Sequence, residues 1–237
     1  MAQVPTSFAD RFSDWYAKES TTSNYDLFLR LPAFAYFGLV VWVQLGALLD
    51  IVLAGNDLPF GIWASSLASR AAGLSVALIF AALTLLRSKP VARAKGLTPR
   101  LVAIAGAGFM FSMVFLERAA PSMGWDLASA VLMTVGGVLT AVVVLRLGRS
   151  FSTMAEARRL VVSGPYRYVR HPLYLAEEIT ILGLLLQFRS WGALVLVVMQ
   201  FGLQVWRMHN EERVLAETFP EYADYARSTS RIVPGVS

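Results

Sequence analysis

The sequence predicts an all-α protein of the polytopic membrane class: a bundle of about six transmembrane helices with a C-terminal helical hairpin and a cytoplasmic tail. Of the 237 residues, 56% are hydrophobic and only 16% are charged, and the mean hydropathy is +0.55. These values lie outside the range of ordinary soluble proteins. The apolar residues also gather in runs long enough to cross a bilayer, with basic residues clustered at the ends of the runs.

Six stretches approach the roughly 20 apolar residues needed to cross the hydrocarbon layer. They run at 31–53, 65–86, 100–117, 126–147, 172–188 and 190–208. The third and fifth are short, and only Arg189 and Ser190 separate the fifth from the sixth. We therefore expect the last two to form a tight hairpin, or a pair that does not fully cross.

The segment before the first span is polar, but Phe8, Phe12, Trp15 and Tyr16 recur at helical spacing. One interpretation is a short helix lying in the headgroup layer, and the other is a disordered tail. No short apolar core with a small-residue cleavage site is present, so we expect no removable signal peptide.

Loop charges predict the orientation. The loop at 87–100 carries five basic residues and no acid, and the loop at 146–170 carries six arginines against the single Glu156. The positive-inside rule places both loops, and with them both termini, in the cytoplasm. This explains the net charge of +5 better than nucleic-acid binding does, so no nucleic-acid partner is expected.

Metal and thiol chemistry are not expected. The chain has no cysteine, and its two histidines, His171 and His209, are too few for a standard histidine-based metal centre.

Several glycine and polar residues inside or near the first three spans can be explained by helix packing or by the interface as well as by function. Gly106 and Gly108 lack the strand that precedes a dinucleotide-binding turn, so close helix packing is the predicted role. Gln44, Asp50 and Arg70 could contact a substrate, or could simply reach the interface.

The stretch 164–178 carries the chemistry. It places Arg167, Arg170, His171, three tyrosines and two carboxylates at the mouth of the fifth span, where polar groups are costly unless paired or used. If the helix starts at His171-Pro172, then His171, Tyr174 and Glu178 share one face.

The sixth span mirrors this pattern. Gln200, Gln204, Arg207 and Glu211 recur as a polar stripe, and Glu212 adds a second carboxylate. An antiparallel hairpin brings these acids opposite His171, forming a pocket with cations and acids on opposing walls. A zwitterionic cofactor suits such a pocket. The alternative is a salt-bridged helix pair at the interface.

The stretch from Gly164 to Tyr174, followed by Glu211-Glu212 and by Phe219, Tyr222, Tyr225, Thr229, Arg231, Pro234 and Gly235, resembles the isoprenylcysteine carboxyl methyltransferase family. The resemblance covers roughly 160–235, about a third of the chain. Together with the phospholipid methyltransferases, this family comprises membrane enzymes that use S-adenosylmethionine without a Rossmann domain. The resemblance therefore implies an S-adenosylmethionine-dependent methyltransferase acting on a lipophilic substrate, most simply a prenylcysteine-type carboxylate or a similar nucleophile.

The resemblance also implies a division of the chain and a set of site residues. The parts would be an N-terminal segment (1–30), a four-helix membrane scaffold (31–147) and a cofactor-binding catalytic region (148–237). The expected catalytic and acceptor-orienting candidates are Arg207, Glu211, Arg231 and Glu178. The expected cofactor contacts are Val161, Val162, Gly164, Tyr166, Arg170, His171, Tyr174, Glu211 and Glu212.

One departure keeps a second reading open. Glu177-Glu178 resembles a Tyr-x-Gly-Glu pattern of sterol-type membrane reductases that use NADPH, although Leu173 stands where those proteins usually have asparagine. A non-enzymatic transporter is a third possibility, because Gln200, Gln204 and Glu178 could line a polar path. The expected location is the plasma or inner membrane of a bacterium, or the endoplasmic reticulum of a eukaryote.

Overall fold

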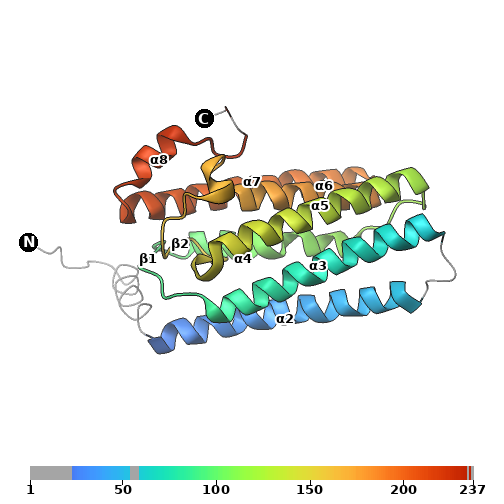
Figure 1. Cartoon of the computed structure of the whole chain (residues 1–237), viewed down its shortest axis with the longest axis horizontal. Helices are drawn as coiled ribbons and strands as arrows, with labels where there is room; N and C mark the ends of the chain where they lie inside the picture. The colour runs from blue at the N-terminus through green and yellow to red at the C-terminus, as the bar shows by residue number, and fades with distance from the viewer. Residues whose placement is uncertain (1–22, 54–58, 234, 236–237) are drawn as a thin grey trace, which may run out of the picture.

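The computed structural model describes residues 23–53, 59–233 and 235. The predicted interfacial helix with Phe8 and Trp15 lies outside these residues. The main helices are α2 (Ser23–Leu53), α3 (Phe60–Leu86), α4 (Thr98–Gly108), α5 (Met123–Leu147), α6 (Pro172–Phe188) and α7 (Trp191–Thr218). The shorter elements are β1 (Ala92–Arg93), η1 (Phe109–Phe115), η2 (Gly148–Ser150), β2 (Glu156–Ala157), η3 (Gly164–Arg167) and α8 (Tyr222–Ser228). The long helices run side by side (Figure 1), and the prediction of an all-α membrane bundle is confirmed.

The spans agree closely with the hydropathy prediction. Within the described ranges, five helical segments are long and apolar enough to cross a membrane: Arg30–Leu53, Phe60–Leu86, Thr98–Phe115, Met123–Ser150 and Trp191–Thr218. The third of these joins α4 to the 3₁₀ segment η1.

The remaining predicted span is α6, whose observed bounds are those expected from the sequence. It has 17 residues, or about 25 Å at 1.5 Å per residue, against a hydrocarbon layer of about 30 Å. It therefore forms the shorter arm of the predicted hairpin. Large apolar side chains such as Trp42 (74% exposed) and Phe115 (87% exposed) cover the outside of the bundle. The chain is an integral membrane protein, because such a surface suits lipid rather than water.

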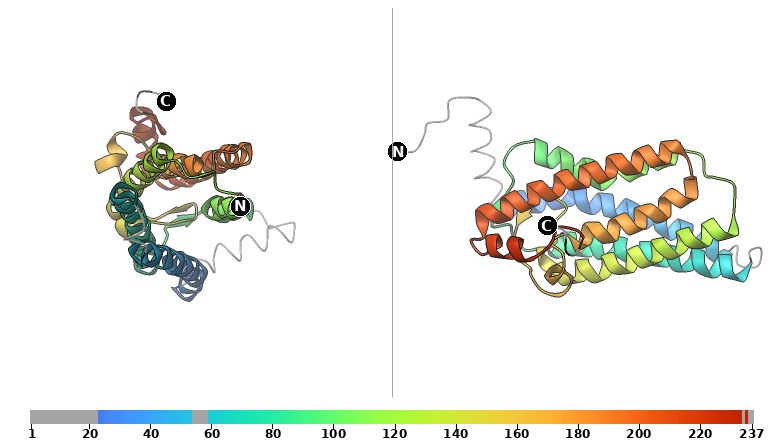
Figure 2. Two further views of the ribbon diagram at one scale, coloured as in Figure 1. Left: turned by 90° about the vertical axis from the view of Figure 1, so that its right-hand side faces the viewer. Right: turned by 90° about the horizontal axis from the view of Figure 1, so that it is seen from above.

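The helices pack in a sequence that curves around a central space. α2 contacts α3, α3 contacts α5, α5 contacts α6, α6 contacts α7, and α7 contacts α4. The left view in Figure 2 shows these helices approximately end-on. Tyr36 connects its two ends: the hydroxyl on α2 donates to the carbonyl oxygen of Ala107 on α4 at 2.8 Å, and the ring packs edge-on against Phe111.

Glycines permit the closest helix contacts. A Cβ on Gly136 of α5 would lie 2.7 Å from the backbone nitrogen of Thr180 on α6, so the backbones of these two helices pack directly against each other. A Cβ on Gly106 of α4 would lie 2.6 Å from Cδ of Arg207 on α7. The predicted packing role of Gly106 is confirmed, whereas nothing lies within 4 Å of the corresponding position on Gly108.

The two basic loops meet in a short antiparallel sheet. Ala92 pairs with Ala157 and Arg93 with Glu156. Glu156 accepts ion pairs from Arg93 at 3.1 Å and from Arg158 at 2.5 Å. Both basic loops therefore lie at the same end of the bundle, as their charge predicts; that this end faces the cytoplasm stays a prediction.

Candidate functional site

The start of α6 is held by the C-terminal tail. Gly164 opens η3 with φ of +64°, a left-handed conformation that favours glycine. The backbone nitrogens of Arg170 and His171 then donate to the carbonyl oxygens of Ser230 and Arg231, at 2.8 and 3.0 Å. Pro172 follows as the first helical residue, where its missing N–H costs nothing. The tail thus fixes where His171 stands.

Glu212 is the electrostatic anchor of this region. Its carboxylate binds His171 Nε2 at 3.0 Å, Arg231 Nη2 at 2.6 Å and Arg170 Nη1 at 3.5 Å. These three partners come from the loop before α6 and from the tail, while Glu212 itself belongs to α7. One carboxylate therefore ties three segments together, in partial burial where such ion pairs are weakly screened.

A cavity of about 410 Å³ opens beside this anchor. At the end near the two loops it is lined by a group that we call the loop half: Glu156, Arg158, Arg159, Val161, Tyr166, Arg170, His171, Tyr222 and Tyr225. Deeper between the helices it is lined by a group that we call the membrane half: Tyr36, Gln44, Arg70, Gly73, Thr140, Glu177, Thr180, Gln200 and Gln204. One space thus joins the charged end of the bundle to its apolar interior.

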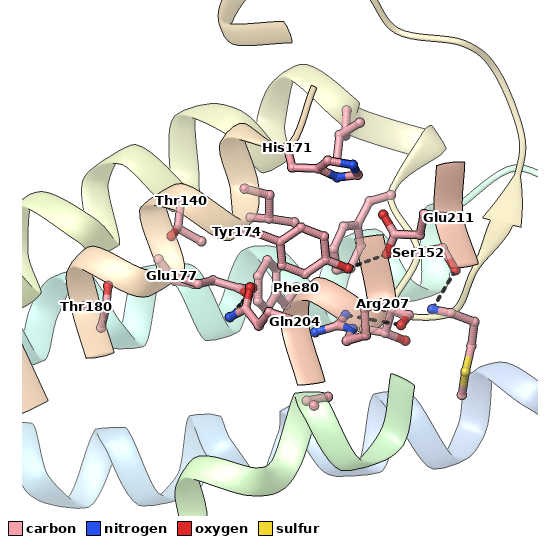
Figure 3. A pocket seen from close by; sticks show the side chains of 18 of the residues that line it. Phe80, Thr140, Ser152, His171, Tyr174, Glu177, Thr180, Gln204, Arg207 and Glu211 are labelled. Atoms are coloured by element: carbon pink, nitrogen blue, oxygen red, sulfur yellow. Dashed lines mark hydrogen bonds between the residues drawn. The ribbon is translucent and has the colours of Figure 1, made fainter. Parts of the chain in front are cut away.

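Arg207, Tyr174 and Glu211 stand where the two halves meet (Figure 3). The Tyr174 hydroxyl donates to the Glu211 carboxylate. The guanidinium of Arg207 lies 5.0 Å from the centre of the Tyr174 ring, and its Nη2 donates to the carbonyl oxygen of Thr153 at 3.3 Å. A cation over an aromatic face is favourable, and more so when it is desolvated. This contact fixes the plane of a buried cation in the wall.

The tyrosines of the loop half are held as neutral hydroxyls. The Tyr225 hydroxyl donates to the carbonyl oxygen of Tyr166 at 2.7 Å. Burial, followed by the charge of Glu212, raises the pKa of Tyr222 to about 12. Burial, followed by the charge of Glu211, raises the pKa of Tyr166 well above its usual value. These rings therefore offer apolar faces and hydroxyl groups, not phenolate charge, at neutral pH.

The membrane half holds a second polar set. Gln204 Nε2 donates to Glu177 Oε2 at 3.3 Å, a contact drawn in Figure 3. Gln200 Nε2 donates to the carbonyl oxygen of Gly106 at 2.9 Å. Both glutamines are buried, at 3% exposed for Gln200 and 0% for Gln204. Polar groups at this depth are costly unless they are used.

Seven of the expected site residues line the cavity, namely Val161, Tyr166, Arg170, His171, Tyr174, Arg207 and Glu211. Five do not line it, namely Val162, Gly164, Glu178, Glu212 and Arg231. Glu212 and Arg231 instead hold His171 and the tail in place, and Gly164 makes the turn. His171 and Tyr174 line the cavity as expected, but the carboxylate beside them is that of Glu177 and not that of Glu178. Both glutamates neighbour Tyr174 on the helix, at three and four residues after it.

Several lining residues had not been assigned to the site. The glutamine stripe on α7 was visible in the sequence, and so was the unusual Glu177. Tyr222 and Tyr225 belong to the region of family resemblance. Tyr36 gave no signal, because one tyrosine in an apolar run is typical of an interfacial anchor.

Comparison with known proteins agrees with the resemblance. The model of the isoprenylcysteine carboxyl methyltransferase family matches residues 129–217, which span most of α5, all of α6 and nearly all of α7. The predicted resemblance is thereby confirmed.

Two curated relatives are similar over about half of the chain. The cobalt-zinc-cadmium resistance protein CzcN of Cupriavidus metallidurans is 35% identical over 120 residues, covering 48% of this chain and 55% of the relative. The nickel-cobalt-cadmium resistance protein NccN of Alcaligenes xylosoxydans xylosoxydans is 31% identical over 133 residues, covering 53% and 62%. In both cases the match spans less than two thirds of the relative's length.

Among solved structures, the eukaryotic intramembrane Ras methyltransferase ICMT (isoprenylcysteine carboxyl methyltransferase) aligns over 97% of this chain and 98% of its own, with 15% identity and a TM-score of 0.45. Within the described residues, no group of three or more histidine, aspartate or glutamate side chains is placed to hold a metal ion.

Proposed function

We propose that this chain, whose residues 129–217 match the model of the isoprenylcysteine carboxyl methyltransferase family, transfers a methyl group from S-adenosylmethionine to a lipophilic acceptor in the membrane. The observation that carries the proposal is the single cavity that joins a charged, tyrosine-lined loop half to a membrane half. A water-soluble donor and a lipid-soluble acceptor need such a meeting place.

The loop half fits S-adenosylmethionine. The cavity volume of about 410 Å³ falls within the range of about 300–1,000 Å³ typical of small-molecule sites. The buried Nε of Arg170 has no hydrogen-bond partner, which suits a carboxylate. His171 and Arg170 would hold the amino-acid portion, Glu211 the ribose or amino groups, and Tyr166 and Val161 the adenine. When bound, the cofactor supplies a methyl group on a positively charged sulfur.

The protein's own task is positioning. Tyr174, Arg207 and Glu211 hold one another at the junction and limit the directions from which an acceptor can approach. Holding two reactants in line is among the largest contributions that a site can make to such a reaction. Apolar side chains of α3 and α5, such as Val76, Phe80 and Met133, line part of the cavity, and a site kept dry in this way would favour a step in which charge is neutralised. An already ionised acceptor would need no general base.

Binding measurements separate this function from the other two. Purified protein in neutral detergent should bind S-adenosylhomocysteine at one site, and His171→Ala should abolish binding without loss of the folded protein. Binding of NADPH with no binding of S-adenosylhomocysteine would favour a reductase instead. Substrate-dependent flux in liposomes, with no binding of either cofactor, would favour a transporter.

The orientation belongs to the same proposal, because the loop half must face the compartment that holds the cofactor. The chain contains no cysteine, so single cysteines can be introduced on a clean background. In sealed, oriented vesicles we expect Ser228→Cys in α8 to react with a membrane-impermeant maleimide only from the cytoplasmic side. Glu117→Cys, at the opposite end of the bundle, should react only from the other side. The reverse pattern would contradict the proposed orientation.

A further inference from the structure

We propose that the methyl acceptor is a lipophilic primary amine, and that the membrane half recognises it through the hydrogen bonds that its N–H groups donate to the wall. This inference rests on the proposed function and narrows its acceptor. The juxtaposition that carries it is a carboxylate, Glu177, beside two buried amide oxygens, those of Gln200 and Gln204, in one wall of the cavity.

Four of the side-chain donors in this wall are committed to the protein. Gln200 donates to Gly106, Gln204 to Glu177, and Tyr36 to Ala107. Thr180 donates to the carbonyl oxygen of Ala176 at 3.3 Å. A ligand that brings acceptor oxygens, such as a carboxylate, would find these four groups occupied and could bind only to other donors, such as the buried Nε of Arg207 at the junction.

The hydrogen-bond acceptors of the wall, in contrast, can still receive hydrogen bonds. The Oε1 atoms of Gln200 and Gln204 are buried without a hydrogen-bond partner. Neither amide can be turned around to relieve this, because each Nε2 is bound to an acceptor, a carbonyl oxygen for Gln200 and a carboxylate for Gln204. Leaving such buried oxygens unpaired is costly, so a ligand that supplies N–H groups relieves a penalty as well as forming bonds.

The local charge points the same way. Glu177 contributes a carboxylate in the second turn of α6, and Glu211, four residues after Arg207 on α7, contributes a second carboxylate. Arg207 is the cation that faces them, but its guanidinium is held by the Tyr174 ring and the Thr153 carbonyl oxygen. Arg70, the other cation of the membrane half, lies on α3 three residues before Gly73. A protonated amine would complement the carboxylates between these two arginines. To accept a methyl group it would first give one proton to the carboxylate of Glu177 or Glu211, which frees the nitrogen lone pair for the new N–C bond as the methyl–sulfur bond of the donor breaks.

The experiment compares three probes with the same dodecyl chain and different head groups. Radiolabelled dodecylamine, dodecyltrimethylammonium and dodecanoate are each equilibrated with the full-length protein in neutral phosphatidylcholine nanodiscs. Dodecylamine and dodecyltrimethylammonium share a positive charge, but only the former has N–H donors. We expect dodecylamine to bind about tenfold more tightly than either of the others, as charged hydrogen bonds of ordinary strength imply.

The variant Glu177→Gln keeps the size of the side chain and its bond to Gln204 while removing the charge. We expect it to weaken dodecylamine binding about tenfold. The matched control is Glu217→Gln, the same change on an exposed residue of α7, which should leave binding unaltered. Gln204→Met, which removes one unpaired oxygen, should lower the preference for dodecylamine over dodecyltrimethylammonium.

Equal or tighter binding of dodecanoate, equal binding of dodecyltrimethylammonium, or unchanged dodecylamine binding by Glu177→Gln would each overturn the proposal. Titration of the same samples with S-adenosylhomocysteine tests the proposed function separately. If the protein binds S-adenosylhomocysteine but shows no preference for the amine, only the proposed class of methyl acceptor is refuted. If it prefers the amine but does not bind S-adenosylhomocysteine, the proposed methyltransferase function is refuted.

Discussion

The two halves of the cavity differ in how their hydrogen-bond acceptors are paired. At the loop end, carboxylates are saturated by protein cations: Glu156, in the loop half, has two as well as the Ser152 hydroxyl at 2.7 Å, and Glu212, beside the cavity, has three. In the membrane half, two amide oxygens are buried without partners. The comparison suggests that the loop half is pre-organised by the protein, while the membrane half is completed by what it binds.

The largest effect should come from the anchor of the loop half. Glu212→Ala leaves His171, Arg170 and Arg231 without their shared partner and frees the tail, so we expect S-adenosylhomocysteine binding to weaken at least about 100-fold, with a lower Tm. Isothermal titration and thermal unfolding in detergent measure the two effects. Glu217→Ala serves as the exposed control on the same helix, and normal binding by Glu212→Ala would show that the network is not needed.

The second largest effect should come from a change to Arg207, where the two halves of the cavity meet. Arg207→Lys keeps the positive charge but loses the planar group that lies over Tyr174 and bonds Thr153. We expect kcat/KM for methyl transfer to fall about 100-fold, or about 2.7 kcal/mol, by loss of positioning. Binding of S-adenosylhomocysteine should stay within about threefold of wild type. A matching loss of cofactor binding would assign Arg207 to the loop half instead.

A smaller effect should come from the helix that faces Arg207. Gly106→Ala places a methyl group 2.6 Å from Cδ of Arg207, so the side chain must shift. Overpacking of this kind costs about 1–3 kcal/mol, and we expect roughly a tenfold loss of kcat/KM. Gly108→Ala is a close control, because its new methyl group would meet nothing within 4 Å. Equal activity of the two variants would contradict the assigned role of Gly106.

The smallest effect should be at Tyr36. Tyr36→Phe removes the bond to Ala107 and retains the edge-on contact with Phe111. A single such bond contributes about 1 kcal/mol. We expect a modest rise in KM for the lipophilic acceptor with unchanged cofactor binding, measured by steady-state kinetics at saturating cofactor. An altered cofactor affinity would mean that the two halves are coupled more tightly than their contacts indicate.

Hydropathy located the helices well because crossing a bilayer demands long apolar runs. It stopped α7 too early, at 208 rather than Thr218, because the last turns of that helix carry Arg207, Glu211 and Glu212 and read as polar. Those turns are helical since they pack against the sheet and the loop: Val214 is buried with Ala155 and Ala157. Tertiary packing of this kind is not visible in a hydropathy window.

For the site, the sequence indicated which loop and which helix end meet, because charge at a membrane boundary is costly and the connection between α6 and α7 is short. It could not decide between Glu177 and Glu178, which lie next to each other near the edge of the same helical face. It also could not separate residues that line the cavity from those that support the lining, such as Glu212 and Arg231. That distinction depends on side-chain direction, which spacing alone does not determine.

The bonds from Arg170 and His171 to Ser230 and Arg231 have a consequence for biosynthesis. The ribosome delivers α2 to α7 to the membrane before the tail emerges, so the apolar bundle can be inserted while the cavity still lacks one of its supports. A nascent chain would therefore reach its membrane topology well before it acquires a competent site. Premature termination after α8 should yield a protein that is inserted, is retained in the bilayer and is inert.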